Sequence, residues 1–260
     1  TGSPRAFRGA VAVGVSSAVA ELRAEASRMY LGFVWWVLEP LMFMAVFYFV
    51  FSVGLRHGDA DYLPFLLSGL IAWKWFASSV EGGANAVSRN AGMIQQVYIP
   101  KYILPGIMLI SNTCKFLFVF LVCVAAWIVL FDKPVTVSWL ALPVVILIQF
   151  IFTAGVLCLF SSLVPFFPDL RPLISNLIML LMFASGIFFD IEKTPEDVRG
   201  ILLLNPVALM VQMYRKVMVD QAWPDPGRML FVLVCGLVCL AIGMWVFIRF
   251  DRVYPKLVKT

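Results

Sequence analysis

The stretch MLFVLVCGLVCLAIGMWVFI, residues 229–248, runs for twenty positions without a charged side chain. An α-helix of that length is about 30 Å long, which matches the hydrocarbon core of a bilayer. The rest of the chain offers no polar layer that could cover such a helix in water, because 62% of the 260 residues are apolar and only 13% are charged. We therefore predict an integral membrane protein.

Five further apolar runs precede this one, and each is long enough for a transmembrane helix. Polar turns such as DKPVTVS and FPDLRP separate them. The fold class that we expect is all-α integral membrane, with six transmembrane helices. The first five spans are expected at residues 31–53, 62–80, 107–131, 139–166 and 173–189.

Two other segments are apolar without fitting a crossing. Residues 17–30 carry apolar side chains at spacings of three and four, with charges on the opposite face, which predicts an N-terminal amphipathic helix at the membrane interface. Residues 190–228 hold two short apolar stretches broken at Asn205 and Pro206. This pattern favours a re-entrant helical hairpin at about 194–219, with a seventh span as the alternative.

The expected organisation is an N-terminal tail with the interface helix (1–30), a six-span membrane domain (31–250) and a C-terminal tail (251–260). Six crossings place both termini on one side of the membrane. Lys and Arg are more numerous in the segments on that side. The positive-inside rule therefore predicts cytoplasmic termini.

The sequence lacks the usual motifs of catalysis and metal binding. There is no GxxxxGK[ST] loop and no HExxH, and the single histidine, His57, lies in a polar turn. The five cysteines all lie inside apolar runs. Acidic residues at 190–197 fit a helix start with Thr194 as N-cap better than a metal-dependent transferase. We expect no catalytic, cofactor-binding or metal-binding residue in this chain, so uphill transport would need energy from a partner.

Four ionisable side chains fall near or inside the expected spans: Glu39, Lys74, Glu81 and Lys115. A charge at mid-depth in lipid costs several kcal/mol, so these groups should face water, a partner or a substrate. Three roles fit Lys74 and Lys115: contact with phosphate or acidic groups of a substrate, structural pairing with the two glutamates, or snorkelling of the long side chain toward the interface.

Four stretches, in this order along the chain, carry a family resemblance: LGFVWWVLEPL (31–41), GLIAWKWFASSVEGGANAVSRNAGMIQQVYIPKYILPG (69–106), FPDLRPLISNLIMLLMFASGIFF (167–189) and LLLNPVALMVQMYRKVM (202–218). Together they resemble the ABC-2 class of ABC transporter permeases. The closest likeness is to the branch that exports polysaccharides and polyol phosphates, in particular capsular polysaccharide inner-membrane subunits. The similarity covers about residues 20–250.

The resemblance implies a homodimer in the bacterial inner membrane, with two separate ATPase subunits that bind ATP and Mg. The implied cargo is a lipid-linked surface polysaccharide, with capsule favoured over O-antigen or teichoic acid and with an outer-membrane conduit as a further partner. Nucleic acid is not expected. The alternatives are an ABC-2 exporter of small lipophilic compounds and a membrane glycosyl or acyl transferase.

The resemblance also assigns roles to particular residues. It implies a cytoplasmic coupling helix at about 89–98 that contacts the ATPase, with Pro100 and Pro105 fixing where the third span begins. The coupling set is Met93, Ile94, Gln95, Gln96, Val97, Tyr98 and Pro100.

A stripe of aromatic rings in the first span, together with the fifth span, would line the glycan channel, because sugar C–H faces stack on rings. The expected channel set is Trp36, Phe43, Phe47, Tyr48, Phe51, Phe183, Lys74 and Lys115.

Overall fold

The computed structural model describes residues 34–49, 62–96, 100–130 and 136–257, and every regular element within those ranges is helical. Four helices are long and apolar enough to cross a membrane, and shorter apolar helices lie at the first and fifth expected spans. The prediction of an all-α membrane protein is confirmed. The expected interface helix at 17–30 lies outside the described residues, as does His57. The six helices at the expected positions are α2 (Val34–Tyr48), α3 (Tyr62–Ala84), α6 (Ile103–Leu130), α7 (Leu142–Leu163, continuing η2 at Val137–Ala141), α8 (Leu170–Ala184) and α11 (Pro226–Phe250).

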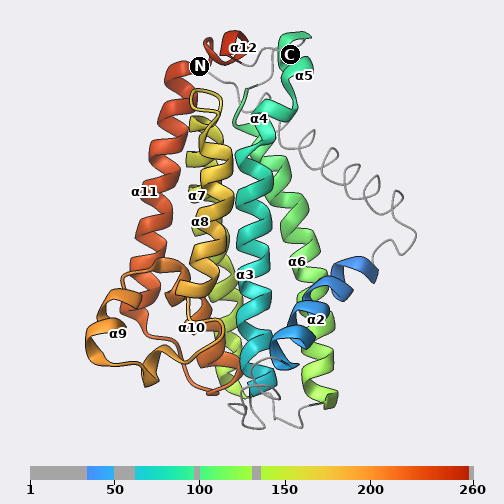
Figure 1. Cartoon of the computed structure of the whole chain (residues 1–260), viewed down its shortest axis with the longest axis vertical. Coiled ribbons are helices and arrows are strands. Elements are labelled where there is room, and N and C mark those ends of the chain that lie inside the picture. Colours follow the sequence, from blue (N-terminus) through green and yellow to red (C-terminus); the bar gives the residue numbers. More distant parts are fainter. Residues whose placement is uncertain (1–33, 50–61, 97–99, 131–135, 258–260) are drawn as a thin grey trace.

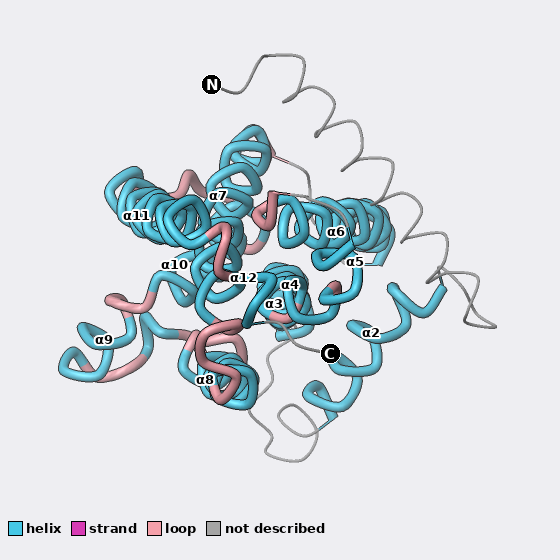
Figure 2. The backbone as a smooth tube through the Cα atoms, turned by 90° about the horizontal axis from the view of Figure 1, so that it is seen from above, coloured by secondary structure: helices cyan, strands magenta, loops and turns pink. Residues whose placement is uncertain are grey.

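The helices form an elongated bundle around α3 (Figures 1 and 2). Most side chains of α3 are buried, and Trp75 stacks on Phe116 of α6 with ring centroids 4.1 Å apart. On another face, Phe76 stacks on Phe152 of α7 at 5.6 Å. The central helix is therefore fixed by aromatic packing against α6 and α7.

The closest helix contact joins α7 to α11, and it is made through glycines. A Cβ added to Gly236 would lie 2.6 Å from Cα of Phe152, and one added to Gly243 would lie 2.7 Å from the backbone nitrogen of Leu159. A Cβ on Gly155 would collide with the carbonyl oxygen of Gly236. Small residues of this kind let two membrane helices meet backbone to backbone, which gives van der Waals contact that larger residues cannot reach.

Three short helices gather at one end of the bundle: α4 (Ala86–Arg89), α5 (Ala91–Gln96) and α12 (Tyr254–Leu257) (Figure 1). Tyr254 is fully buried there, and its hydroxyl donates to the carbonyl of Ser162 at 3.0 Å. Burial raises the pKa of Tyr254 well above its usual value, so the hydroxyl remains a donor at neutral pH. Lys101, 2% exposed, lies 3.3 Å from Asp251. Both contacts hold the end of the chain against the bundle.

Replacing Tyr254 with phenylalanine should lower the free energy of unfolding by about 1 kcal/mol, because the ring stays packed and one buried hydrogen bond is lost. The measurement is thermal or denaturant unfolding of the purified protein in detergent. Tyr102→Phe is the matched control, because that tyrosine is 37% exposed and its hydroxyl has no partner within the described ranges. Equal stability of both variants would show that the Tyr254 hydrogen bond contributes nothing.

The helix at the fifth expected span differs from the predicted bounds, 173–189. Helix α8 begins at Leu170 and ends at Ala184, so its 15 residues extend over about 22 Å. The helix stops because Gly186 takes a φ of +66°, and a Cβ there would lie 2.5 Å from the Ile191 side chain. Residues 185–189 form a turn that hydropathy alone could not separate from the helix.

The expected hairpin region folds as η3 (Ile191–Lys193), α9 (Glu196–Leu202) and α10 (Pro206–Met218) at the other end of the bundle (Figure 1). Asn205 caps α10 by accepting from the Val207 amide at 2.9 Å, and Pro206 occupies the first turn. Thr194 is not the N-cap of α9, because Pro195 precedes the first helical residue and the Thr194 hydroxyl donates back to Ile191.

A buried arginine ties α10 to its neighbours. The guanidinium of Arg215, which is 6% exposed, donates to the carbonyls of Gly186 at 2.5 Å and Ile187 at 2.6 Å, and it lies 3.4 Å above the Phe65 ring. Burial lowers the pKa of Arg215 to about 9, opposed by the charge of Asp190, so the group is still positive at neutral pH. Arg215 thus joins α10 to the start of α3 and to the turn after α8.

Candidate functional site: a polar groove along the central helix

One face of α3 is open, and that face is polar. Every residue from 71 to 89 that is not buried is polar or glycine. Its side chains follow at spacings of four, three, four and three, so they form one stripe along the helix and onto α4. We call this set the polar stripe: Lys74, Ser78, Glu81, Asn85 and Ser88.

Three cavities lie in a row along the polar stripe. The first, about 170 Å³, lies between α2, α3 and α6 and is lined by Glu39, Lys74 and Lys115. The second, about 180 Å³, lies between α3 and α8 and shares Lys74 with the first. The third, about 360 Å³, lies between α4 and α8 and shares Ser175 with the second. The three cavities therefore lie next to one another along the stripe, and we call them together the groove.

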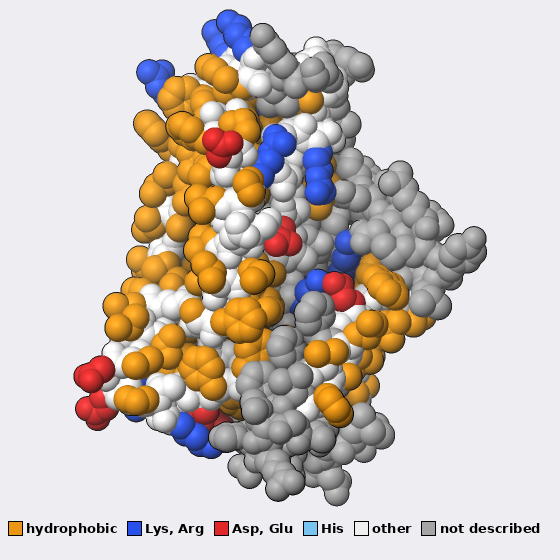
Figure 3. Space-filling model, in the orientation of Figure 1, with side chains coloured by type: hydrophobic (Ala, Val, Ile, Leu, Met, Phe, Trp, Pro, Cys, Tyr) orange, Lys and Arg blue, Asp and Glu red, His pale blue; other side chains and the backbone are white. Residues whose placement is uncertain are grey.

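Charged side chains lie in the middle of this face of the molecule, between hydrophobic side chains (Figure 3). The Nζ atom of Lys74 lies 2.5 Å from Oε1 of Glu39, and both side chains are about two-fifths exposed, at 40% and 38%. Lys74 is twelve residues into a spanning helix, so it lies about 18 Å from the helix start, near the middle of the membrane. A half-exposed ion pair at this depth needs water, substrate or another protein surface as its neighbour.

The structure pairs Lys74 with Glu39, which is one of the roles that the sequence left open, and contact of Lys74 with a substrate stays a prediction. Lys115 lies over the ring of Trp36, 5.5 Å from its centroid, which is a cation–π contact. Glu81 is exposed on the stripe and lines the second cavity. Asn112 adds an amide to the first cavity and donates to the carbonyl of Ser78 at 3.2 Å.

The structure brings only part of the predicted channel set together. Trp36, Lys74 and Lys115 line the first cavity. Phe183 of α8 is half exposed, lines none of the three cavities, and packs against Phe188 with centroids 5.6 Å apart. The remaining aromatic members lie on α2, at Phe43, Phe47 and Tyr48, or outside the described residues, at Phe51.

The sequence analysis missed the uncharged members of the groove, Ser78, Asn85, Ser88, Asn112 and Ser175. A usable signal was present. All five members of the stripe fall at helical spacing within or directly after an apolar run. A polar face on a spanning helix is typical of a surface in contact with water or substrate.

The predicted coupling helix at 89–98 differs from the observed elements. Two short helices, α4 and α5, replace one helix, and Asn90 separates them. Ile94 is 5% exposed and packs with Val87, Leu104 and Tyr254, so its side chain faces the bundle. Gln95 is exposed and Pro100 is half-buried. Met93 and Gln96 lie on α5, and Val97 and Tyr98 lie outside the described residues.

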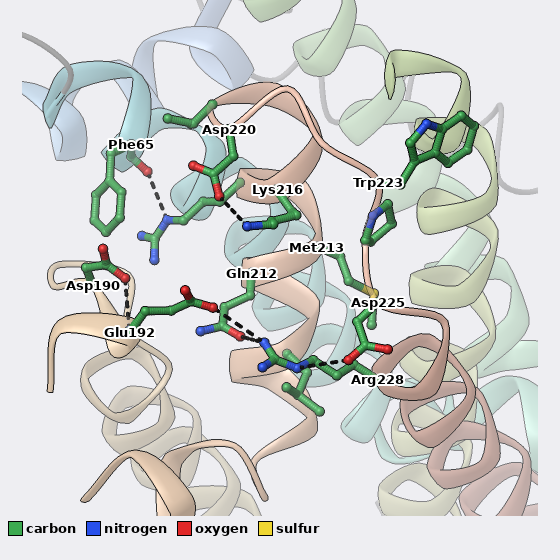
Figure 4. Close-up of a pocket in the computed structure, with 14 residues that line it drawn as sticks. Phe65, Asp190, Glu192, Gln212, Met213, Lys216, Asp220, Trp223, Asp225 and Arg228 are labelled. Atoms are coloured by element: carbon green, nitrogen blue, oxygen red, sulfur yellow. Dashed lines mark hydrogen bonds and ion pairs between the residues drawn. The ribbon is translucent and has the colours of Figure 1, made fainter. Parts of the chain in front are cut away.

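A second polar pocket, of about 280 Å³, lies at the opposite end of the bundle beside α10. Arg228 points toward Gln212, Glu192 and Asp225 there, and Lys216 toward Asp220 (Figure 4). The nitrogens of Arg228 lie 2.9 Å from the Gln212 oxygen and 3.6 Å from Asp225. Arg228 and Lys216 already have partners, so this pocket is a weaker candidate for a ligand-binding site than the groove.

The groove can hold a polar chain by hydrogen bonds and ring contacts. Within the described ranges, no group of three or more His, Cys, Asp or Glu side chains comes together as metal ligands do. The lining of the groove offers hydroxyl, amide, charged and aromatic groups, which make non-covalent contacts.

An apolar helical bundle with a polar groove along a spanning helix is typical of membrane transport proteins. The chain belongs to the ABC-2 type transporter family, whose model matches residues 18–219. It is similar to the O-antigen export system permease protein of Myxococcus xanthus, at 29% identity over 85% of each chain. It is 28% identical to a permease of the same name from Klebsiella pneumoniae, over 87% of each chain. A polysialic acid transport protein of Escherichia coli is 24% identical over 86% of this chain and 88% of its own length.

Proposed function

We propose that this chain is the permease subunit of an ATP-driven exporter that moves a lipid-linked surface polysaccharide across the bacterial inner membrane. The polar stripe on α3 carries the proposal, because a polar face on a spanning helix needs water, a substrate or another protein surface against it, and a path for a hydrophilic substrate meets that need. The names of the relatives support polysaccharide as the cargo class. Permeases for O-antigen and for capsule are both among them, so the proposed cargo includes both, and the sequence-based preference for capsule is not needed.

The open groove supports a homodimer. Hydrocarbon cannot solvate the exposed Glu81 or the half-exposed pair of Glu39 and Lys74. A second copy that faces the first across α2 and α8 would close the groove into a conduit. The expected aromatic residues of α2, with Phe183 of α8, would then lie in or beside that conduit and contact sugar rings.

Charge supports the proposed orientation, with six spans and cytoplasmic termini. The bundle end with α4, α5 and α12 carries six basic residues and two acidic ones in the described part of the chain. The end with α9 and α10 carries five basic residues, Lys193, Arg199, Arg215, Lys216 and Arg228, and six acidic ones, so the excess of Lys and Arg at the α4 end is a single residue in the described part of the chain. Placing the basic end in the cytoplasm satisfies the positive-inside rule. The ATPase subunits, which bind ATP and Mg, would dock on α4 and α5, and α9 and α10 would form the outer hairpin.

Export should fall at least roughly tenfold when the groove is made apolar, because the weak contacts along the path are replaced by leucine side chains that fill it. The variant is Ser78→Leu with Asn85→Leu. The measurement is surface polysaccharide against cytoplasmic polysaccharide in a strain that depends on the variant. Finished chains should accumulate in the cytoplasm.

Cys114→Leu is the matched control, because that cysteine is exposed on α6 and lines none of the cavities of the groove. Both proteins must reach the membrane in equal amounts. Normal export by the double variant would overturn the conduit. Loss of finished chains, without cytoplasmic accumulation, would instead favour a transferase.

A further inference from the structure

Two arginines meet in the third cavity of the groove, at the α4 end of the bundle. Arg89 is the last residue of α4, and Arg171 lies in the first turn of α8. Both line the same cavity of about 360 Å³, with Asn85, Ser88 and Ser175 completing its polar wall. The chain thus brings two cations from segments about eighty residues apart to one opening.

Neither arginine has an acidic partner among the residues that the structure describes. Within the described part of the chain, neither guanidinium has an ion pair or a hydrogen bond, and the hydroxyls of Ser88 and Ser175 have no hydrogen-bond partner. Asp169, two residues before Arg171, does not line the cavity. Two unpaired like charges in one cavity repel each other, so a bound anion would stabilise the arrangement.

The side chains, and not the helix backbone, would bind that anion. The amides of Leu170 and Arg171 already donate to the carbonyls of Phe167 and Pro168, and Pro172 has no amide hydrogen. The guanidinium groups are therefore the principal donors. Their planar pairs of N–H groups match the oxygens of a phosphate, and two of them can hold one phosphoryl group.

The depth of the cavity indicates which phosphate reaches it. Helix α3 has 23 residues and is about 34 Å long, so it crosses the hydrocarbon core, and α4 begins just beyond its end. The cavity therefore lies at the level of lipid headgroups. It adjoins the second cavity, with which it shares Ser175 as a lining residue.

We infer that Arg89 and Arg171 bind the phosphoryl group of a lipid headgroup at the cytoplasmic mouth of the groove, and this inference rests on the proposed function. The next charged residue along the stripe is Glu81, eight residues before Arg89 and about 12 Å deeper. Its carboxylate repels a phosphate. The phosphoryl group would be held at the mouth while the glycan moves on past it.

The experiment uses the full-length permease with its ATPase partner in nanodiscs. The probes are a short polyprenyl diphosphate and the polyprenol of the same length, with phosphatidylglycerol against phosphatidylcholine as a second pair. Binding is counted by native mass spectrometry or by titration. The variants are Arg89→Gln, Arg171→Gln and both together, with Arg249→Gln as control, because Arg249 is an exposed arginine at the same end that lines no part of the cavity.

Each single variant should lower the affinity for the diphosphate roughly tenfold, and the double variant should lower it further, while Arg249→Gln leaves it unchanged. Lysine at both positions should restore part of the affinity, since charge returns without the planar fork. Preference for the polyprenyl diphosphate over phosphatidylglycerol would identify the cargo's lipid as the source. Equal binding of both would identify ordinary phospholipid.

Equal affinity for polyprenol and its diphosphate, or unchanged affinity in the double variant, would overturn the inference. A double variant that keeps its lipid affinity but no longer assembles with the ATPase would assign the arginines to that partner instead. The proposed function fails separately, since normal export by the Ser78 and Asn85 variant leaves the phosphate binding measurement intact.

Discussion

Replacing Gly236 with leucine should leave little folded protein in the membrane. The added side chain starts 2.6 Å from the backbone of Phe152, and neither helix can move away without losing the whole α7–α11 contact. We expect a cost of about 3 kcal/mol or more, since overpacking against backbone cannot be relieved by a rotamer change. Alanine at the same position should show a smaller loss in the same direction. The measurement is the yield of monodisperse protein after detergent extraction, followed by thermal unfolding.

Gly106→Leu provides the matched control. Gly106 also lies within a long apolar helix, α6, and a Cβ there meets nothing within 4 Å. That variant should accumulate and unfold as the unaltered protein does. Similar behaviour of the two variants would mean that the glycines of α7 and α11 do not determine stability.

Replacing Arg215 with methionine should destabilise the end of the bundle that carries α10 by about 3–5 kcal/mol. The apolar side chain fills much of the same space but leaves the carbonyls of Gly186 and Ile187 buried without donors. Lysine should rescue only part of the loss, because one ammonium cannot match the fork of the guanidinium. Unfolding in detergent gives the size of the effect. Faster limited proteolysis between residues 186 and 228 would locate the destabilisation at the α10 end.

Lys216→Met is the control for Arg215. Lys216 is the next residue along α10, and its side chain is 43% exposed and pairs with Asp220 at 3.1 Å on the surface. Its loss should change stability by no more than about 0.5 kcal/mol. If both variants were equally stable, the contacts of Arg215 with the start of α3 and the turn after α8 would contribute nothing to stability.

The sequence predicted the helices well because hydrophobicity alone sets where a chain can cross lipid. It could not predict the early end of α8, since Ser185, Gly186 and Ile187 are as apolar or small as residues inside the helix. What ends the helix is the conformation of Gly186 and the pairing of its carbonyl with Arg215, which comes from 29 residues further along the chain. Tertiary contacts of this kind leave no local pattern.

Only some residues of the site could be predicted, again because tertiary contacts leave no local sequence pattern. Glu39, Lys74 and Lys115 could be singled out as costly charges, but a sequence does not say which face of a central helix remains uncovered. The pairing of Glu39 with Lys74 joins helices 35 residues apart, and Ile94 turned inward because α12 covers that end. Nothing in the sequence links Arg89 to Arg171. The fold brings them to one cavity because α4 and α8 lie on either side of it.

The backbone contact between α7 and α11 has a mechanical consequence. Together with α3, these two helices form a rigid part of the bundle. The helices on either side of the polar stripe, α8 and α2, are held by few buried side chains. Helix α8 buries only Ile174 and Ile178, and α2 buries no side chain among its described residues. A force applied at α4 would therefore tilt α2 and α8 before it deformed the packing of α3, α7 and α11. Moving α2 and α8 apart would widen the groove and would disturb little of the packing between α3, α7 and α11.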